Sequence, residues 1–261
     1  MARFCPLFSS SSGNCIYIGS GNTNILIDCG VSAKKISSAL ENLGLSKEDI
    51  SAIFITHEHS DHICGLHAFA AKSDIPIYTS AVTFNALKEM DSVCKDIKLN
   101  IIEDYVDING MIIKRFATVH DCDGSSGYRI DLKDGHSFAV CTDTGIITPE
   151  IKENLFGCQL VMIESNHDVN MLQNGPYPPQ LKMRIISDKG HLSNGTCAKL
   201  LPELIKKGTT RIILGHLSKN NNLPSIAATT SRSELLKEGF IENQDYILYV
   251  APPENAQLIS L

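Results

Sequence analysis

The sequence contains no run of apolar residues that approaches the ~20 residues needed to cross a membrane as a helix. Its opening segment, MARFCPLFSSSSGN, has one early Arg but too short an apolar stretch for a signal peptide. Gly and Pro are scarce, at 18 and 10 of 261 residues, which argues against collagen-like or low-complexity structure. Because 43% of the residues are hydrophobic, we expect a folded protein with no membrane partner.

The sequence also lacks a disulfide pattern. Its nine Cys residues are an odd number, and no two of them form a C-x-x-C pair. A chain of this length does not need disulfides to fold, and disulfides are rare in the cytosol. We therefore expect reduced thiols and a cytoplasmic protein.

The sequence has fewer basic than acidic residues: 23 Lys and Arg stand against 29 Asp and Glu, which gives a formal net charge of -6. A protein that coats nucleic acid is usually basic, so this balance argues against that class. Two bound divalent cations would offset most of the negative charge. A local basic face could then still contact phosphates, and charge alone does not identify the partner.

No linker, internal repeat or block of like charge divides the chain, so residues 1–261 are predicted to form a single domain. Apolar, β-rich runs alternate with helical patterns throughout the chain. The predicted strands are 14–19, 23–30, 51–56, 75–80, 111–118, 126–132, 136–142, 159–164, 210–214 and 245–250. The predicted helices are 33–43, 61–72, 82–90, 148–155, 194–207 and 223–238. Strands in both halves, with helices outside, favour an α/β fold of two packed sheets flanked by helices, a four-layer αββα sandwich.

The most informative segment is His57-Glu58-His59-Ser60-Asp61-His62, directly after the strand SAIFIT. In an extended chain, residues i and i+2 point the same way, so His57 and His59 can converge on one ion. Asp61 and His62 enter the following helix, point elsewhere and suit a second ion. Imidazole and carboxylate ligands together fit Zn, Mn or Fe. Three His and one Asp within six residues favour a metal site over a polar loop with incidental histidines.

This H-x-H-x-D-H segment resembles the signature of the metallo-β-lactamase superfamily of dinuclear hydrolases, whose fold is the αββα sandwich. That family has further site residues at the ends of later strands. Four residues match them in order: Asp28, His120, Asp143 and His216. In the family, the residue that corresponds to Asp28 orients a ligand rather than binding metal.

The resemblance implies two divalent metal ions per chain, which would be Zn, Mn or Fe. One ion would be held by His57, His59, His120 and Asp143. The other would be held by Asp61, His62, Asp143 and His216, with Asp61 also a candidate catalytic residue. A hydroxide that bridges the ions would be the nucleophile, because two cations lower the pKa of bound water. Since the His and Asp residues fill both positions, we expect Cys29 and Cys122, which lie near these motifs, to pack rather than bind metal.

A candidate proton donor narrows the reaction. Glu164 ends the strand QLVMIE, and His191 follows in Gly190-His191-Leu192-Ser193. Both resemble residues of the ribonuclease Z group, where a Glu–His pair near the metals acts on the leaving group. A His held by a carboxylate suits that general acid role in phosphodiester cleavage. A surface-loop role for His191 and an ion-pair role for Glu164 are the alternatives.

Two segments favour anion binding near this pair. Ser193 or Asn194 is a good N-cap for the helix that runs to residue 207, whose free N–H groups would attract phosphate oxygens. The serine-rich segment 9–14 includes Ser12 and Asn14. If the first predicted hairpin forms, Asn14 lies across from Asp28 at the metal end of the sheet. The serine loop would then bind a substrate phosphate or be a flexible hairpin.

Overall, the chain is most similar to the YycJ (WalJ) group of bacterial metallo-β-lactamase-fold nucleases. The similarity rests on SSSSGNCIYI, on the segment 164–168 and on GHLSNGTCAKLL. It implies a 5′→3′ exonuclease that acts on double-stranded DNA, with a link to DNA repair. His167 and Asp168 would lie near the cleft, either to position the substrate or as a hydrogen-bonded loop pair. Dimers are common among relatives, so the resemblance leaves the homodimer as an alternative to the monomer.

Segment 170–189 contains three Pro residues and is predicted to be a long irregular loop that forms one wall of the substrate groove. The basic residues that could follow a nucleic-acid backbone are Lys182, Arg184, Lys189 and Lys219, although such clusters are often only solvated.

The leading hypothesis is therefore a metal-dependent phosphodiesterase acting on DNA. The metal-bridging hydroxide attacks phosphorus, and His191, held by Glu164, protonates the leaving oxygen. The first alternative is a small-molecule metallo-hydrolase for a cyclic phosphodiester, lactone or thioester. The second is a metal-binding regulatory protein with negligible turnover.

Overall fold

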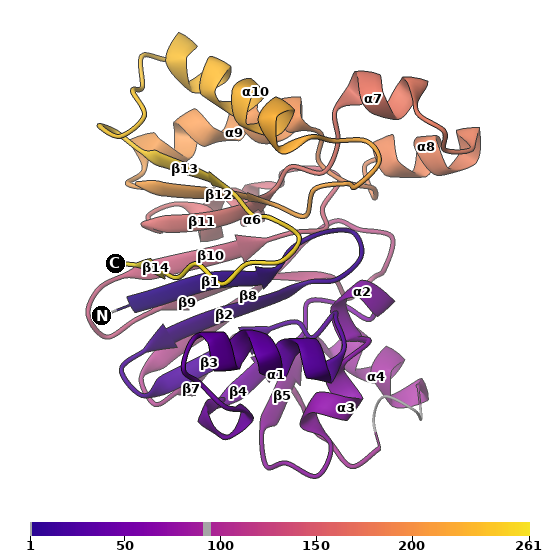
Figure 1. The fold of residues 1–261 in the computed structure, drawn as a ribbon, viewed down its shortest axis with the longest axis vertical. Helices are drawn as coiled ribbons and strands as arrows, with labels where there is room; N and C mark the ends of the chain where they lie inside the picture. Colours follow the sequence, from indigo (N-terminus) through magenta and orange to yellow (C-terminus); the bar gives the residue numbers. More distant parts are fainter. Residues whose placement is uncertain (1, 91–94) are drawn as a thin grey trace.

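Two seven-stranded sheets lie face to face at the centre of the protein (Figure 1). The computed structural model describes residues 2–90 and 95–261. The strands of the first sheet, in spatial order, are β14 (Ile259–Ser260), β1 (Ala2–Phe8), β2 (Cys15–Ser20), β3 (Thr23–Ile27), β4 (Ala52–Phe54), β5 (Pro76–Thr79) and β6 (Lys98–Ile101). Those of the second are β13 (Ile247–Val250), β12 (Arg211–Gly215), β11 (Leu160–Glu164), β10 (Ser137–Cys141), β9 (Ser126–Asp131), β8 (Met111–Ala117) and β7 (Tyr105–Ile108).

Each sheet combines an antiparallel part with a parallel part. In the first sheet, β14, β1, β2 and β3 pair antiparallel, whereas β3, β4, β5 and β6 pair parallel. In the second, β7, β8, β9 and β10 pair antiparallel, whereas β10, β11, β12 and β13 pair parallel. Parallel strands all end at the same edge of a sheet, and ligands of such sheets bind beyond their carboxyl ends. The residues after β3, β4, β10, β11 and β12 are therefore the first place to look for a site.

Helices cover the outer face of each sheet (Figure 1). Those on the first sheet are α1 (Ala33–Asn42), α3 (Leu66–Ala70) and α4 (Ala81–Glu89). Those on the second are α6 (Pro149–Leu155), α9 (Asn194–Lys206) and α10 (Pro224–Lys237). The predicted α/β fold of four αββα layers is thus confirmed.

The central strands are buried on both faces, which explains their continuous apolar runs. In β3, Ile25 and Ile27 pack into the core between the sheets, while Leu26 packs into the core beneath the first helical layer. In β11, Met162 and Val161 divide in the same way between the inter-sheet core and the core beneath the second helical layer. Successive side chains of a strand point to opposite faces, so a strand covered on both sides needs apolar residues at every position.

The segment after β11 differs from its prediction. Residues 170–189 were expected to form an irregular loop, but α7 (Val169–Asn174) and α8 (Pro179–Ile186) occupy much of it. Pro179 is the first residue of α8, a position where the missing N–H costs nothing. The prolines of this segment therefore start a helix instead of preventing one, and the loop prediction was wrong. The two helices project from the sandwich at the end where α2 (Ser60–Ile63) also lies (Figure 1).

Smaller differences have local causes. The predicted helix 61–72 is divided into α2 and α3, and Gly65 lies between them. A Cβ at Gly65 would lie 1.9 Å from the carbonyl oxygen of Val31, so this position packs directly against backbone. Strands β1, β6, β7 and β14 have no counterpart among the predicted strands. The single-domain assignment of residues 1–261 stays a prediction.

Within the two described stretches of the chain, no helix combines the length and apolar content needed to pass through a bilayer.

Candidate metal centre

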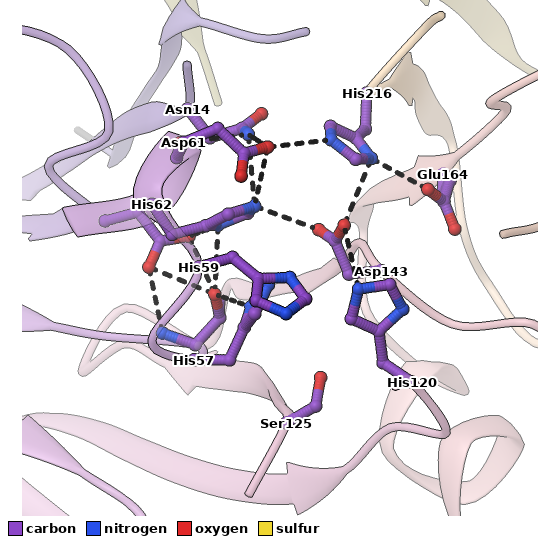
Figure 2. A network of polar contacts seen from close by, with 12 residues as sticks. Asn14, His57, His59, Asp61, His62, His120, Ser125, Asp143, Glu164 and His216 are labelled. Atoms are coloured by element: carbon purple, nitrogen blue, oxygen red, sulfur yellow. Dashed lines mark hydrogen bonds and ion pairs between the residues drawn. The ribbon is translucent and has the colours of Figure 1, made fainter. Parts of the chain in front are cut away.

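Polar side chains from both sheets meet at the carboxyl ends of the parallel strands (Figure 2). Asp28 follows β3, Asp143 lies two residues beyond β10, and His216 directly follows β12. All three have a positive φ, of 63°, 55° and 54° respectively, so the chain turns sharply at each strand end. Non-glycine residues in this region carry strain, which is typical of functional sites.

Three imidazoles are oriented by acceptors on their Nδ1 atoms. Nδ1 of His62 donates to Oδ2 of Asp28 at 2.7 Å, and Nδ1 of His216 donates to Oε1 of Glu164 at 2.7 Å. Nδ1 of His120 donates to the carbonyl oxygen of Gly190 at 3.1 Å. Because carboxylates and carbonyls can only accept, each Nδ1 carries a hydrogen, and Nε2 is the ring atom left for another partner. This arrangement is the usual support for metal-binding histidines.

The free ring atoms face the interior of the site. Nε2 of His57, Nε2 of His216 and Oδ2 of Asp143 are buried and have no hydrogen-bond partner within residues 2–90 and 95–261. A buried polar atom without a partner is costly, and such atoms are uncommon in folded proteins. A bound cation would satisfy all of them, so these residues fit metal ions.

The candidate ligands form two adjoining groups (Figure 2). In one, Nε2 of His62 lies 3.3 Å from Oδ2 of Asp143 and 3.5 Å from Oδ2 of Asp61. Nε2 of His216 lies 3.6 Å from the same oxygen of Asp61. The other group contains the rings of His57, His59 and His120, whose centroids are 4.6–5.2 Å apart. Asp143 lies between the groups, with Oδ1 4.0 Å from Nε2 of His120. The seven sequence-predicted ligand residues are therefore together.

The electrostatic environment suits cations. Burial, reinforced by the neighbouring ring of His62, lowers the pKa of His57 well below its ordinary value, so this imidazole is neutral. Burial also lowers the pKa of His216, but the carboxylates of Asp143, Asp61 and Glu164 outweigh it and raise that pKa to about 10. The surplus of carboxylates around His216 thus attracts positive charge.

Glu164 connects the proposed proton donor to this centre. It is fully buried at the end of β11, and its Oε1 accepts from Nδ1 of His191 at 2.8 Å. The same oxygen accepts from His216, while Oε2 accepts the backbone N–H groups of Thr144 and Leu192, both at 3.1 Å. The predicted Glu164–His191 contact is present. The Glu164–His216 contact was not anticipated, although the parallel pairing of Glu164 with Gly215 in β11 and β12 places His216 beside it.

The other predicted residues lie around the centre with different partners. Asn14 donates from Nδ2 to Nε2 of His62 at 3.2 Å, so the serine-rich segment reaches the metal end of the sheet, and Ser12 is exposed there. Ser193 caps α9 by accepting from the N–H of Thr196 at 3.1 Å, as the sequence predicts.

His167 and Asp168 lie three and four residues beyond the end of β11. His167 is 2% exposed, and its Nδ1 is buried without a hydrogen-bond partner among the described residues. Asp168 caps α7 by accepting from the N–H of Met171 at 2.9 Å. A substrate contact by either residue stays a prediction.

Of the four predicted basic residues, two have acidic partners. Arg184 pairs with Asp121, and Nζ of Lys189 lies 3.9 Å from Asp123. Lys182 donates to the carbonyl oxygen of Gln173 at 2.8 Å, and Lys219 is exposed. Among the thiols, Cys29 packs in the core, and Cys122 lies within reach of His57 and His59.

Two cavities border the candidate site residues. One, of about 260 Å³, is lined by His191, Arg184 and Tyr177. The other, of about 540 Å³, is lined by Glu58, His59 and His67. A third cavity, of about 400 Å³, is lined by the serine-rich segment and Lys219, and it adjoins the first because Ser218 lines both.

Comparison with known proteins gives consistent matches. A family model described as the beta-lactamase superfamily domain matches residues 23–217. The protein is 36% identical over 261 residues to the exodeoxyribonuclease WalJ of Streptococcus pneumoniae, with 97% of this chain and 96% of that protein covered. It is 33% identical over 254 residues to the exodeoxyribonuclease YycJ of Bacillus anthracis, with the same coverage of 97% and 96%. The metallo-beta-lactamase fold protein YhfI from Bacillus subtilis superposes with a TM-score of 0.73 at 14% identity, covering 99% of this chain and 98% of that one.

Proposed function

Because the chain belongs to the metallo-β-lactamase superfamily and is a metal-dependent hydrolase, we propose that it acts on DNA as an exodeoxyribonuclease. We further propose that it degrades double-stranded DNA from 5′ ends, as the similarity to the YycJ group implies. The observation that carries the proposal is the Glu164–His191 pair beside the candidate metal ligands, with His191 lining a cavity. Phosphodiester hydrolysis needs a proton donor for the leaving oxygen, and this pair supplies one.

We assign two metal positions to the ligand groups. As the family resemblance implies, the first would be held by His57, His59, His120 and Asp143, and the second by Asp61, His62, Asp143 and His216, all of which belong to groups that could hold an ion. Bound divalent ions would neutralise charge on the phosphate and lower the pKa of a water molecule. Asp28 and Glu164 orient His62 and His216 through their Nδ1 atoms.

In this proposal His191 holds the proton that the leaving oxygen needs. Its Nδ1 is committed to Glu164, which leaves Nε2 as the atom that can donate to the substrate. Glu164 is fully buried and is held by two backbone N–H groups, so the imidazole is fixed from behind. Phosphodiester hydrolysis therefore depends on the orientation of His191 as well as on the metals.

One observation keeps a small-molecule hydrolase as the second candidate. The cavity that His191 lines is only about 260 Å³, close to the lower end of the roughly 300–1,000 Å³ of small-ligand pockets. A cyclic phosphodiester, a lactone or a thioester would be the substrate in that case. A cytoplasmic location, a homodimer and a link to DNA repair stay predictions.

The deciding experiment compares substrates and variants in one assay. End-labelled duplex DNA, single-stranded DNA, RNA and bis-p-nitrophenyl phosphate are incubated with protein loaded with Mn²⁺ or Zn²⁺, and with its Asp143→Ala and His191→Ala variants. We expect nucleotides to be released from duplex 5′ ends, and both substitutions to abolish release. Turnover of the small diester alone, or of a lactone or thioester in a parallel screen, would instead identify the second candidate. A chain that binds metal but turns over none of these substrates would point to a regulatory role.

A further inference from the structure

Asp121 faces the candidate metal centre although no motif includes it. It directly follows His120, and its side chain is 23% exposed. Its two oxygens have different partners. Oδ2 accepts from Nε of Arg184, whereas Oδ1 lies 3.2 Å from Nε2 of His120 and 3.5 Å from Nε2 of His59. The side chain is thus held by a guanidinium on one oxygen and aimed at two imidazoles with the other.

The contact between Asp121 and His120 brings two acceptors together. Nδ1 of His120 donates to the carbonyl oxygen of Gly190, so Nε2 of the neutral ring carries a lone pair. Oδ1 of Asp121 is also an acceptor. Two lone pairs at 3.2 Å repel each other unless a positive centre lies between them. A cation held jointly by both atoms turns this repulsion into two attractive contacts.

The spacing of the three atoms matches a coordination shell. Ligand nitrogens and oxygens bind Zn²⁺ at about 2.0–2.2 Å, so two ligand atoms that subtend 90° to 120° at an ion with five or more ligands lie about 3.0–3.6 Å apart. The separations from Oδ1 of Asp121, 3.2 and 3.5 Å, lie within that range. A surface ion pair with Arg184 explains the position of Oδ2, but it does not explain why Oδ1 points at two imidazole nitrogens.

We propose that Asp121 is an additional carboxylate ligand of the ion held by His57, His59 and His120, and that Arg184 positions it. The inference rests on the metal assignment of the proposed function, to which it adds a ligand and a preference. An extra oxygen ligand suits Mn²⁺ more than Zn²⁺, since carboxylates favour manganese and imidazoles favour zinc. Asp121 therefore shifts this position toward manganese.

The test measures ion binding and needs no substrate. The full chain, Asp121→Asn and Asp123→Asn are each titrated with Mn²⁺ and with Zn²⁺ against a chromogenic chelator, and the bound ions are counted by mass spectrometry. Asp123 is the matched control, because it lies two residues away, is 88% exposed and, in the part of the chain that the structure describes, pairs with Lys189 alone, at 3.9 Å. Both substitutions remove one negative charge from the same loop.

We expect Asp121→Asn to lower the affinity for one of the two Mn²⁺ ions by about 10- to 100-fold, and to lower the affinity for Zn²⁺ by less. Asp123→Asn should bind both metals with the same affinity as the unmodified chain. Arg184→Gln should lower the affinity for the same Mn²⁺ ion by a smaller factor, because the carboxylate of Asp121 remains but loses its contact with the guanidinium. If Asp121→Asn does not fold, as judged by circular dichroism, Arg184→Gln decides the question.

Unchanged Mn²⁺ affinity in Asp121→Asn, or an equal loss in Asp123→Asn, would overturn the inference and leave the nuclease proposal intact. An unmodified chain that binds no ion would overturn both. Two ions bound with the predicted dependence on Asp121, in a chain that does not cleave DNA, would uphold the ligand and refute the nuclease.

Discussion

Oε1 of Glu164 accepts a hydrogen bond from Nδ1 of His216 at 2.7 Å, although 52 residues separate them in the sequence. The same oxygen accepts from Nδ1 of His191 at 2.8 Å. One buried carboxylate thus orients a candidate metal ligand and the candidate proton donor together. The two functions can be separated experimentally, because His216 belongs to the assigned ligands and His191 does not.

Substitutions at Glu164 and His191 should therefore have different consequences. We expect His191→Ala to bind two ions normally but to lose about 10²- to 10⁴-fold in the rate of DNA hydrolysis, the usual contribution of a general acid. Glu164→Gln should lose activity and also bind metal about 10- to 100-fold more weakly, because His216 loses its carboxylate. Steady-state hydrolysis and metal titration of the same preparations measure both effects.

A control pair lies on the outer helices. Nζ of Lys152 donates to the carboxylate of Glu203 at 2.8 Å, and neither residue belongs to a group that could hold an ion. Glu203→Gln should leave both activity and metal affinity unchanged. Normal metal affinity in Glu164→Gln would show that Glu164 does not support His216.

Gly30 is a position where the fold admits no side chain. A Cβ there would lie 1.7 Å from the carbonyl oxygen of Asp61, which is backbone and cannot turn away. We expect Gly30→Ala to lower the free energy of unfolding by about 1–3 kcal/mol or more and to displace the metal-binding segment. Urea unfolding and metal titration measure these two effects.

Gly195 in α9 is the matched control. The nearest atom to a Cβ at this position is Oγ of Ser193 at 3.9 Å, so there is room for a methyl group. Gly195→Ala should raise the free energy of unfolding by about 0.4–1 kcal/mol, because alanine restricts the unfolded chain. Equal destabilisation by the two substitutions would contradict the packing argument.

The sequence predicts this site well wherever the chemistry is local. His57, His59, Asp61 and His62 lie within six residues, and the direction of a strand followed by a helix determines where they point. Contacts between residues that are far apart in the sequence cannot be predicted in this way. The Gly190 carbonyl that orients His120 lies 70 residues away, and no pattern in the sequence predicts that contact.

The secondary structure, too, is predicted where the local pattern is strong and is missed where the pattern is weak. Most of the buried central strands are predicted because their apolar runs are continuous, whereas the short strands β6, β7 and β14 lie at sheet edges and carry weaker patterns. Strand β1 is the exception: it is buried between β14 and β2 but was not predicted, and Pro6 within it disfavours a strand assignment. Helices α7 and α8 have six and eight residues. Isolated helices of this length are marginal, so tertiary contacts decide whether they form. The bond between Arg184 on α8 and Asp121 is one such contact.

Metal binding should stabilise the fold measurably. Nε2 of His57 and Nε2 of His216 are buried without hydrogen-bond partners, and an ion would satisfy both. An ion present at 100 times its Kd should raise the free energy of unfolding by about 2.7 kcal/mol per site. Asp143→Ala should lose most of this gain, because Asp143 lies between the two ligand groups. Thermal unfolding during a Mn²⁺ titration measures the effect.

Asp134→Ala provides the comparison for that titration, because Asp134 lies in the turn between β9 and β10 and pairs with His136, which is not a candidate ligand. Its Tm should rise with Mn²⁺ as much as that of the unmodified chain. An equal rise in Asp143→Ala would show that Asp143 does not hold the ions.

Binding of duplex DNA should depend on Lys219. This exposed residue lies three positions after His216 and lines the cavity beside the serine-rich segment. If Lys219 contacts a phosphate, Lys219→Gln should weaken binding by a similar factor for all DNA sequences. It should also reduce the slope of log K against log salt by about 1, because one fewer counterion is released. Fluorescence anisotropy in a His191→Ala background, in which cleavage is about 10²- to 10⁴-fold slower, gives both quantities.

Lys133, in the turn between β9 and β10, lines a different cavity with the turn between β2 and β3, so Lys133→Gln should leave the slope unchanged. Equal slopes for Lys219→Gln and the His191→Ala background would place the DNA backbone elsewhere.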